Sequence, residues 1–108
     1  SAAKFWVDAL GNSTTINGSY NMASWADTGL GVATGTIATD FSSASWCGQV
    51  SVLDATTRWN AANSTFNGFT AKAAGTFEVR QVTIQDGTTA VYTMTDPTRW
   101  LASGFGDH

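Results

Sequence analysis

Apolar and polar residues alternate along this sequence in short stretches that end at glycine, asparagine or aspartate. The stretch 45–54 is the clearest, because it places Trp46, Gly48, Val50 and Val52 on one side of an extended chain. Alternation with a period of two puts successive side chains on opposite faces of a β-strand. No stretch sustains the period of about 3.6 residues that marks an amphipathic helix. We therefore expect an all-β chain.

Turn signals divide the alternation into short predicted strands. These cover residues 4–9, 14–16, 20–26, 32–39, 45–54, 65–71, 76–84, 88–94 and 99–105. The pairs Asn17-Gly18 and Asp86-Gly87 are typical of two-residue hairpin turns. Gly35 lies inside a predicted strand, where glycine weakens the strand unless a bulge or a close backbone approach needs it. The spacing predicts an antiparallel β-sandwich or barrel-like domain of about seven to nine short strands.

The length of the chain bounds its organisation. A chain of 108 residues is close to the usual size of one domain, and no repeat or linker divides it, so we expect a single domain over residues 1–108. A chain of this length can bury enough surface to fold without disulfide bonds or metal ions, so we expect no cofactor and no metal ion. The lone Cys47 excludes an intramolecular disulfide and is predicted to be a small buried residue on a strand. The small first residue, Ser1, suggests a near-complete gene product.

The charge of the chain limits its partners. Charged residues make up 12% of the sequence, against a usual quarter, and the net charge is -3. The lysines and arginines are scattered, so we expect no binding to nucleic acid. No apolar run approaches the roughly 18 residues of a membrane span, and the first residues do not form a signal peptide. We therefore expect no membrane insertion.

Several segments, taken in order, resemble one group of proteins. They are Ala3-Lys4-Phe5-Trp6-Val7, Gly18-Ser19-Tyr20-Asn21-Met22-Ala23-Ser24, Phe41-Ser42-Ser43-Ala44-Ser45-Trp46, Asp96-Pro97-Thr98-Arg99-Trp100 and Gly104-Phe105-Gly106-Asp107. Together they cover most of the chain, which resembles a module of tail-fibre and related virion proteins of tailed bacteriophages. The resemblance implies a β-structured virion component, commonly at the distal part of a fibre and often a homotrimer. The stretch 30–35 departs from the pattern, because it is richer in glycine.

The resemblance and the composition together lead to an expected function. We expect a non-catalytic structural protein of a bacteriophage virion, either a tail-fibre-like module for host attachment or a head-fibre or decoration protein. It would be made in the host cytoplasm and lie at the virion surface, outside the cell once assembled. The expected partners are the other chains of a homotrimer, other virion proteins and host cell-surface polysaccharide. The alternative is a lectin-like carbohydrate-binding module of a secreted bacterial protein, which predicts a monomer.

Residues for catalysis are scarce in the sequence. The histidine, His108, is the last residue, so neither a histidine-based triad nor a histidine-rich metal site is expected. A pair of carboxylates can hydrolyse glycosides, but most aspartates here fall at turns or strand ends, where aspartate caps backbone N–H groups. Glu78 is expected to pair with a cross-strand neighbour. Arg99 is expected to pair with Asp96 or with an acidic group of another chain.

The aromatic residues are the remaining candidates for contacts. Five of them are predicted to lie in the core or in a subunit interface: Trp6, Trp25, Trp46, Trp100 and Phe105. The polar loop 54–64 carries Arg58, Trp59 and Asn60, and loops on a rigid β-scaffold often carry binding residues. We therefore predict a receptor or glycan contact at these three residues. The alternative, that Trp59 folds back over the core or against a neighbouring subunit, stays open.

Overall fold

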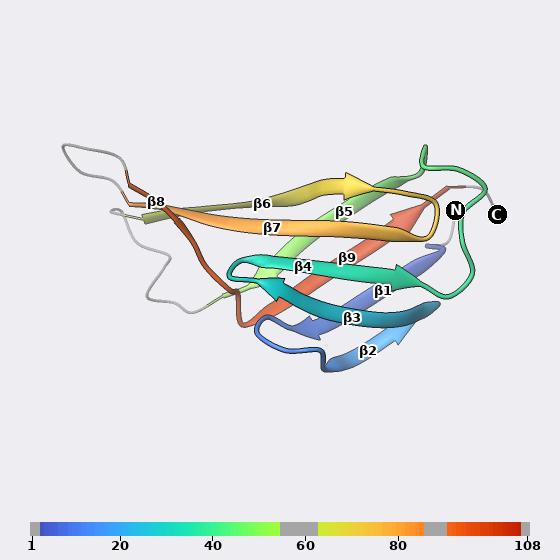
Figure 1. The fold of residues 1–108 in the computed structure, drawn as a ribbon, viewed down its shortest axis with the longest axis horizontal. Helices are drawn as coiled ribbons and strands as arrows, with labels where there is room; N and C mark the ends of the chain where they lie inside the picture. Colours follow the sequence, from blue (N-terminus) through green and yellow to red (C-terminus); the bar gives the residue numbers. More distant parts are fainter. Residues whose placement is uncertain (1–2, 55–62, 86–90, 107–108) are drawn as a thin grey trace.

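The computed structural model describes residues 3–54, 63–85 and 91–106. In this part of the chain there is no helix, and nine strands form two antiparallel sheets that face each other (Figure 1). Buried side chains from both sheets fill the space between them. The prediction of an all-β, antiparallel sandwich is therefore confirmed.

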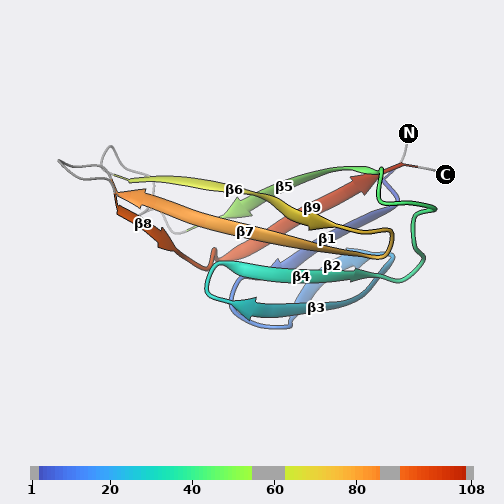
Figure 2. The ribbon, with the colours of Figure 1, turned by 45° about the horizontal axis from the view of Figure 1, so that its top comes forward.

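The first sheet has the strand order β2-β1-β9-β5. Its strands are β1 (Phe5–Leu10), β2 (Ile16–Tyr20), β5 (Cys47–Leu53) and β9 (Arg99–Phe105). β1 and β9 lie side by side at its centre, and Lys4 N donates to Gly104 O over 2.8 Å where β1 begins and β9 ends. Both views place this end of the sandwich away from β8 (Figures 1 and 2).

The second sheet has the order β3-β4-β7-β6, with β8 added to β7. Its strands are β3 (Met22–Gly29), β4 (Val32–Ile37), β6 (Asn63–Lys72), β7 (Thr76–Gln85) and β8 (Val91–Met94). β6 pairs with β7 along nearly its whole length, whereas β4 pairs with residues 76–80 of β7 and β8 with residues 82–85. β4 and β8 therefore follow each other along the same edge of β7.

Gly31 holds the junction between β4 and β8. Its N–H donates to Asp96 Oδ1 over 2.7 Å, and its carbonyl accepts from Gln81 N over 2.8 Å. Its φ of 70° lies in the left-handed region, which glycine adopts without strain. The junction therefore depends on a glycine and on a carboxylate from the chain that follows β8.

The core is built from aromatic rings. Phe5 stacks on Phe77 with ring centroids 5.0 Å apart, and Phe41 stacks on Trp46 at 4.9 Å. Phe5 and Trp46 join the two pairs edge to face at 5.5 Å. Such stacked and edge-on pairs are the favoured arrangements of aromatic rings. The Trp46 indole N–H donates to Ala73 O over 2.7 Å, so its polar atom is satisfied in the core.

Beyond the sandwich, β8 and the adjoining parts of β6 and β7 form a projecting arm. We define the arm as residues 63–69, 80–85 and 91–94. In both views it extends to the left past the turn between β3 and β4 and past the end of β5 (Figures 1 and 2). The arm makes the molecule elongated, with extents of 48 × 25 × 23 Å.

Some expectations about local structure were wrong. Asn17 and Gly18 lie within β2, and the chain turns before them, over residues 11–15. The stretch 20–26 is interrupted at Asn21, whose φ is 59° and which lies between β2 in one sheet and β3 in the other. The expected turn at Asp86-Gly87 lies outside the described residues.

Two expectations about single side chains were also wrong. Cys47 is exposed rather than buried, because it alternates with the inward-facing residues of β5 and points out of the sandwich. Arg99 pairs with Asp8, with Nη1 3.3 Å from Oδ2. Asp8 lies on the adjacent strand β1, beside Arg99 on the outer face, whereas Asp96 instead holds the β4–β8 junction.

Candidate functional site

The structure divides the predicted aromatic residues into two groups. Trp25, Trp46 and Trp100 are buried in the core. Trp6 is 46% exposed and points out of the first sheet. Phe105 is half-buried and shares that outer face, because it alternates with the buried residues of β9. An interface role for these two residues stays a prediction.

Arg58, Trp59 and Asn60 lie outside the described residues. Their contact with a receptor or glycan therefore stays a prediction.

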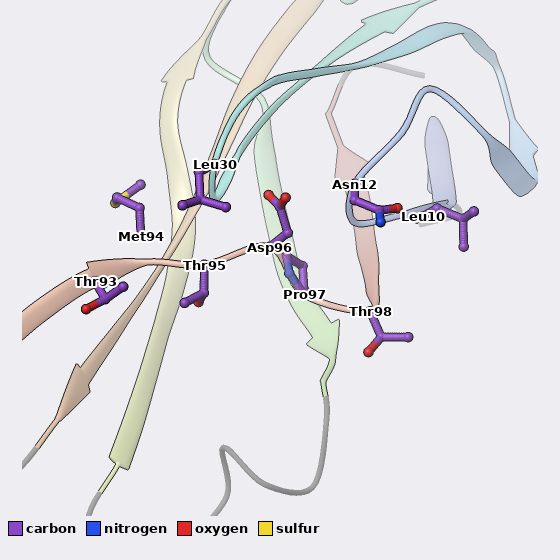
Figure 3. Close-up of a pocket in the computed structure, with 9 residues that line it drawn as sticks. All are labelled: Leu10, Asn12, Leu30, Thr93, Met94, Thr95, Asp96, Pro97 and Thr98. Carbon is purple, nitrogen blue, oxygen red and sulfur yellow. The ribbon is translucent and has the colours of Figure 1, made fainter.

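A cavity of about 700 Å³ lies beside the junction of β4 and β8. Asp96 alone is ionisable among the nine residues that line it. Its carboxyl group points to one side of the chain, whereas Thr95 and Thr98 point to the other (Figure 3). Asp96 already accepts a hydrogen bond from the Gly31 N–H. The polar side chains of the cavity therefore do not converge on one ligand position.

The described residues contain neither a metal-binding cluster nor a membrane-spanning helix. No group of three or more histidine, cysteine, aspartate or glutamate side chains in this part of the chain lies in position to hold a metal ion. The same residues contain no helix long and apolar enough to cross a membrane.

The outer face of the first sheet carries an exposed aromatic pair. Trp6 on β1 lies directly opposite Tyr20 on β2, which is 56% exposed. The Trp6 ring lies over Gly18, where an added Cβ would stand 3.4 Å from ring atoms Cη2 and Cζ3. The missing side chain at Gly18 lets the indole lie close to the backbone of β2. We call Trp6 and Tyr20 the aromatic platform.

A groove of about 260 Å³ runs beside this platform. Ser103 lies between Trp6 and Gln49 in one cross-strand row, and Leu101 lies between Asp8 and Ser51 in the next. Their side chains, together with parts of Val7 and Ala102, line the groove. The groove therefore combines one exposed ring with a carboxylate, an amide and two hydroxyl groups.

Asp8 is held in position within this groove. Its Oδ2 accepts from Arg99 Nη1 at 3.3 Å, and its Oδ1 lies 3.5 Å from Asn17 Nδ2. The charged side chains on the strands of this face are Asp8 and Arg99, and they neutralise each other. The outer face of the first sheet thus has hydrogen-bonding groups but no net charge.

The arm carries a second exposed surface. Phe66, Val82 and Met94 lie directly opposite one another on β6, β7 and β8, and form an apolar row across all three strands. Phe66 is 55% exposed. On the other face of β7, Gln81 and Thr83 are buried and polar. The outer face of the arm therefore carries the apolar row, and its inner face carries the buried polar side chains of Gln81 and Thr83.

The inner face of the arm is held by hydrogen bonds. Gln81 Nε2 lies 3.3 Å from both Asp54 Oδ2 and Thr95 Oγ1, and Thr83 Oγ1 is 2.9 Å from Thr95 Oγ1. Buried polar groups favour such partners, since an unpaired group costs free energy. These bonds fix which face of the arm points outward.

A hollow of about 310 Å³ continues the apolar row. Gly68 lies at its base, and nothing stands within 4 Å of a Cβ placed there. Two residues of its lining, Thr70 and Arg80, bond Glu78: Glu78 Oε1 accepts from Thr70 Oγ1 at 2.7 Å and from Arg80 Nε at 2.9 Å. These hydrogen bonds, from Thr70 first and then from Arg80, hold the pKa of Glu78 below its ordinary value. The cross-strand partner predicted for Glu78 is thus Thr70.

Sequence reasoning did not single out Tyr20 or Phe66, although a signal for Phe66 exists. Phe66 and Phe69 are three residues apart on one strand, so they point to opposite faces and only one of them can enter the core. Phe69 packs against the core, and Phe66 does not. Tyr20 carried no such signal, because the alternation around it suggested a continuous strand.

Comparison of the chain with protein-family models, with curated proteins and with solved structures found no match.

Proposed function

We propose that this chain is a non-catalytic structural module exposed at the surface of a bacteriophage particle, where it serves host attachment or decoration and assembles with copies of itself. The sequence resemblance to tail-fibre and related virion proteins supports the viral assignment. The arm supports the assembly, and its apolar row of Phe66, Val82 and Met94 is the single observation that carries the proposal.

The apolar row requires a partner for a physical reason. Soluble monomers bury most of their large apolar side chains, and contiguous exposed apolar surface marks contact sites. The row is continuous across three paired strands and is followed by an open hollow at Gly68. A second copy of the chain fits this surface, because it supplies the same apolar row. The resemblance to fibre modules makes the expected assembly a homotrimer.

Three carboxylates of the described chain support a non-catalytic role. Asp8 is bonded to Arg99 and Asn17, Asp96 to Gly31, and Glu78 to Thr70 and Arg80. The bond between Glu78 and Arg80 lies within β7, and the others join different strands or the segments that connect strands. These three carboxylates therefore act as parts of the scaffold.

The assembly is tested by the molar mass of the purified chain in solution, measured by light scattering across a dilution series. We expect a species of about 34 kDa, three times the 11.3 kDa chain mass. Phe66→Ser should shift the equilibrium towards monomer, because each chain loses an apolar contact worth about 1.5–3 kcal/mol when fully buried.

The matched control is Leu53→Ser, which changes a residue that is 52% exposed on β5, in the other sheet. It should leave the molar mass unchanged. A wild-type monomer at all concentrations would overturn the assembly, as would an assembly that Leu53→Ser disrupts and Phe66→Ser does not. The viral assignment fails if the neighbouring reading frames encode a secreted enzyme rather than tail or capsid components.

The aromatic platform favours the second candidate, a carbohydrate-binding module of a secreted bacterial protein. Trp6 and Tyr20 present two exposed rings beside polar side chains, as a sugar-binding surface would. This candidate predicts an 11.3 kDa monomer, so the same light-scattering experiment separates it from the first.

A further inference from the structure

We infer that the groove beside the aromatic platform is a binding site for an uncharged saccharide, with Trp6 as the ring on which one sugar unit stacks. The inference rests on the attachment role proposed above and names the chemical class of the ligand. It does not depend on self-association, because the arm and the groove lie on different sheets.

The exposed indole is the first part of the argument. A large aromatic residue that is 46% exposed lies on a strand whose neighbouring residues, Phe5 and Val7, are buried. Trp6 therefore faces outward because of the strand alternation, not because the core lacks space for it. Indole combines an apolar face with a polar N–H. A pyranose ring has the matching character, because one of its faces is made of C–H groups and its edge carries hydroxyl groups.

The polar lining is the second part. Gln49 offers an amide donor and acceptor, Ser51 and Ser103 offer hydroxyl groups, and Asp8 offers a carboxylate. These groups come from three neighbouring strands, so the hydrogen-bonded sheet fixes the positions of their backbones. Small-molecule sites typically combine an apolar surface with a few convergent polar groups in this way.

The size and charge of the groove select the ligand. Its volume of about 260 Å³ is below the range of about 300–1,000 Å³ for drug-sized ligands. It therefore suits one ring of a longer chain that continues across the sheet towards Tyr20 or β5. Asp8 and Arg99 neutralise each other, so the face has no unpaired charge on its strands that would favour an anionic polymer.

A second copy of the chain is the competing occupant of this face. A subunit interface favours a dry, apolar centre, whereas this groove has Ser103 beside Leu101 at its centre and the polar side chains of Asp8, Gln49 and Ser51 around them. The apolar row on the arm already offers a surface that suits a second copy. We therefore assign the groove to a saccharide.

The test uses the full chain on an array of uncharged hexose and N-acetylhexosamine oligosaccharides, followed by titration of the best ligand. We expect wild-type binding and an increase in Kd of about tenfold for Trp6→Ala, the scale of one aromatic contact. Gln49→Ala should weaken binding with no change in folding. Leu53→Ala is the matched control, since it removes an exposed apolar side chain from the same sheet outside the lining of the groove, and it should leave Kd unchanged.

Two outcomes would overturn the inference. One is a wild-type chain that binds no uncharged saccharide on the array, or that binds only anionic glycans. The other is a change of molar mass in Trp6→Ala, which would show that this face is a subunit interface. A failure of self-association would be distinguishable from a failure of this inference. The wild-type chain would then be a monomer in light scattering, but it would still bind the array, and Trp6→Ala would still weaken that binding.

Discussion

Two strand glycines lie under the aromatic rings of their cross-strand partners. Gly35 is paired with Phe77, and an added Cβ there would stand 2.3 Å from Phe77 Cζ. Gly104 is paired with Phe5, and its added Cβ would stand 2.2 Å from Phe5 Cε1. Glycine weakens an isolated strand, but here its bare backbone lets the stacked pair Phe5–Phe77 lie flat between the sheets.

Gly35→Ala should destabilise the domain by about 1–3 kcal/mol, because the new methyl group meets the buried ring of Phe77 and overpacks the core. Urea unfolding followed by tryptophan fluorescence measures the difference. Gly68→Ala is the matched control in the same sheet, and its added methyl group meets no atom within 4 Å. It should change the free energy of unfolding by less than about 0.5 kcal/mol. Equal losses in the two variants would contradict the role given to Phe77.

The sequence contained part of this information. Gly35 inside a predicted strand suggested a bulge or a close backbone approach; in the structure β4 and β7 pair here without a register shift, and the ring of Phe77 lies against this glycine. The identity of the approaching ring depends on the pairing of β4 with β7. Residues more than forty positions apart meet in this pair, and no local pattern specifies which distant strand will be the neighbour.

At the level of strands, alternation predicted where most of them lie. The prediction for 99–105 matches β9, and that for 76–84 matches β7 to within a residue. The error at 14–26 has a physical cause. Asn21 takes a left-handed conformation and its side chain bonds Lys4 O and Thr39, so the chain passes from one sheet to the other with only one residue between strands. Asparagine tolerates this conformation, but its presence alone does not reveal it.

A change in the alternation of apolar residues along β7 indicated the apolar outer face of the arm. Along β7 the apolar residues Phe77 and Val79 point inward, whereas Val82 and Ile84 point outward, with Arg80 and Gln81 between them. A strand that packs against a single core keeps its apolar residues on one face along its whole length. The change therefore indicates two different environments along one strand.

The junction of β4 and β8 yields the prediction at this scale. Asp96→Ala should cost about 1–3 kcal/mol of stability, because the part-buried N–H of Gly31 loses its acceptor. Asp96→Asn keeps a side-chain oxygen at the same position and should cost less. Hydrogen exchange at Gly31 and Gln81 measures the local effect. Unchanged protection of these amides in Asp96→Ala would show that the carboxylate does not hold the junction.

For the molecule as a whole, the two candidate surfaces lie on different sheets, and each can act without covering the other. The groove belongs to the first sheet and the apolar row to the arm of the second. The sequence predicted the fold class, but not this division. The predicted contact residues Arg58, Trp59 and Asn60 came from a loop, whereas the described candidates Trp6, Tyr20 and Phe66 lie on strands.

The reactivity of the Cys47 thiol indicates which surface is covered in the assembled protein. It is exposed on β5, on the same outer face as Gln49 and Ser51. If copies meet through the arm, the native assembly should react with a thiol-specific chromogenic reagent at one thiol per chain, without denaturant. Protection of Cys47 in the assembly, with reaction only after unfolding, would place the subunit contact on the first sheet instead.

The adjacent start of β1 and end of β9, joined by the bond from Lys4 to Gly104, has a practical consequence. Both strands meet at the pole of the molecule opposite the arm (Figures 1 and 2). A fluorescent label or a carrier domain grafted at that pole leaves the arm open, whereas the groove lies near that pole, because its row of Trp6 and Ser103 is next to the pair Phe5–Gly104. A carrier attached there therefore presents the arm at the far end of the domain.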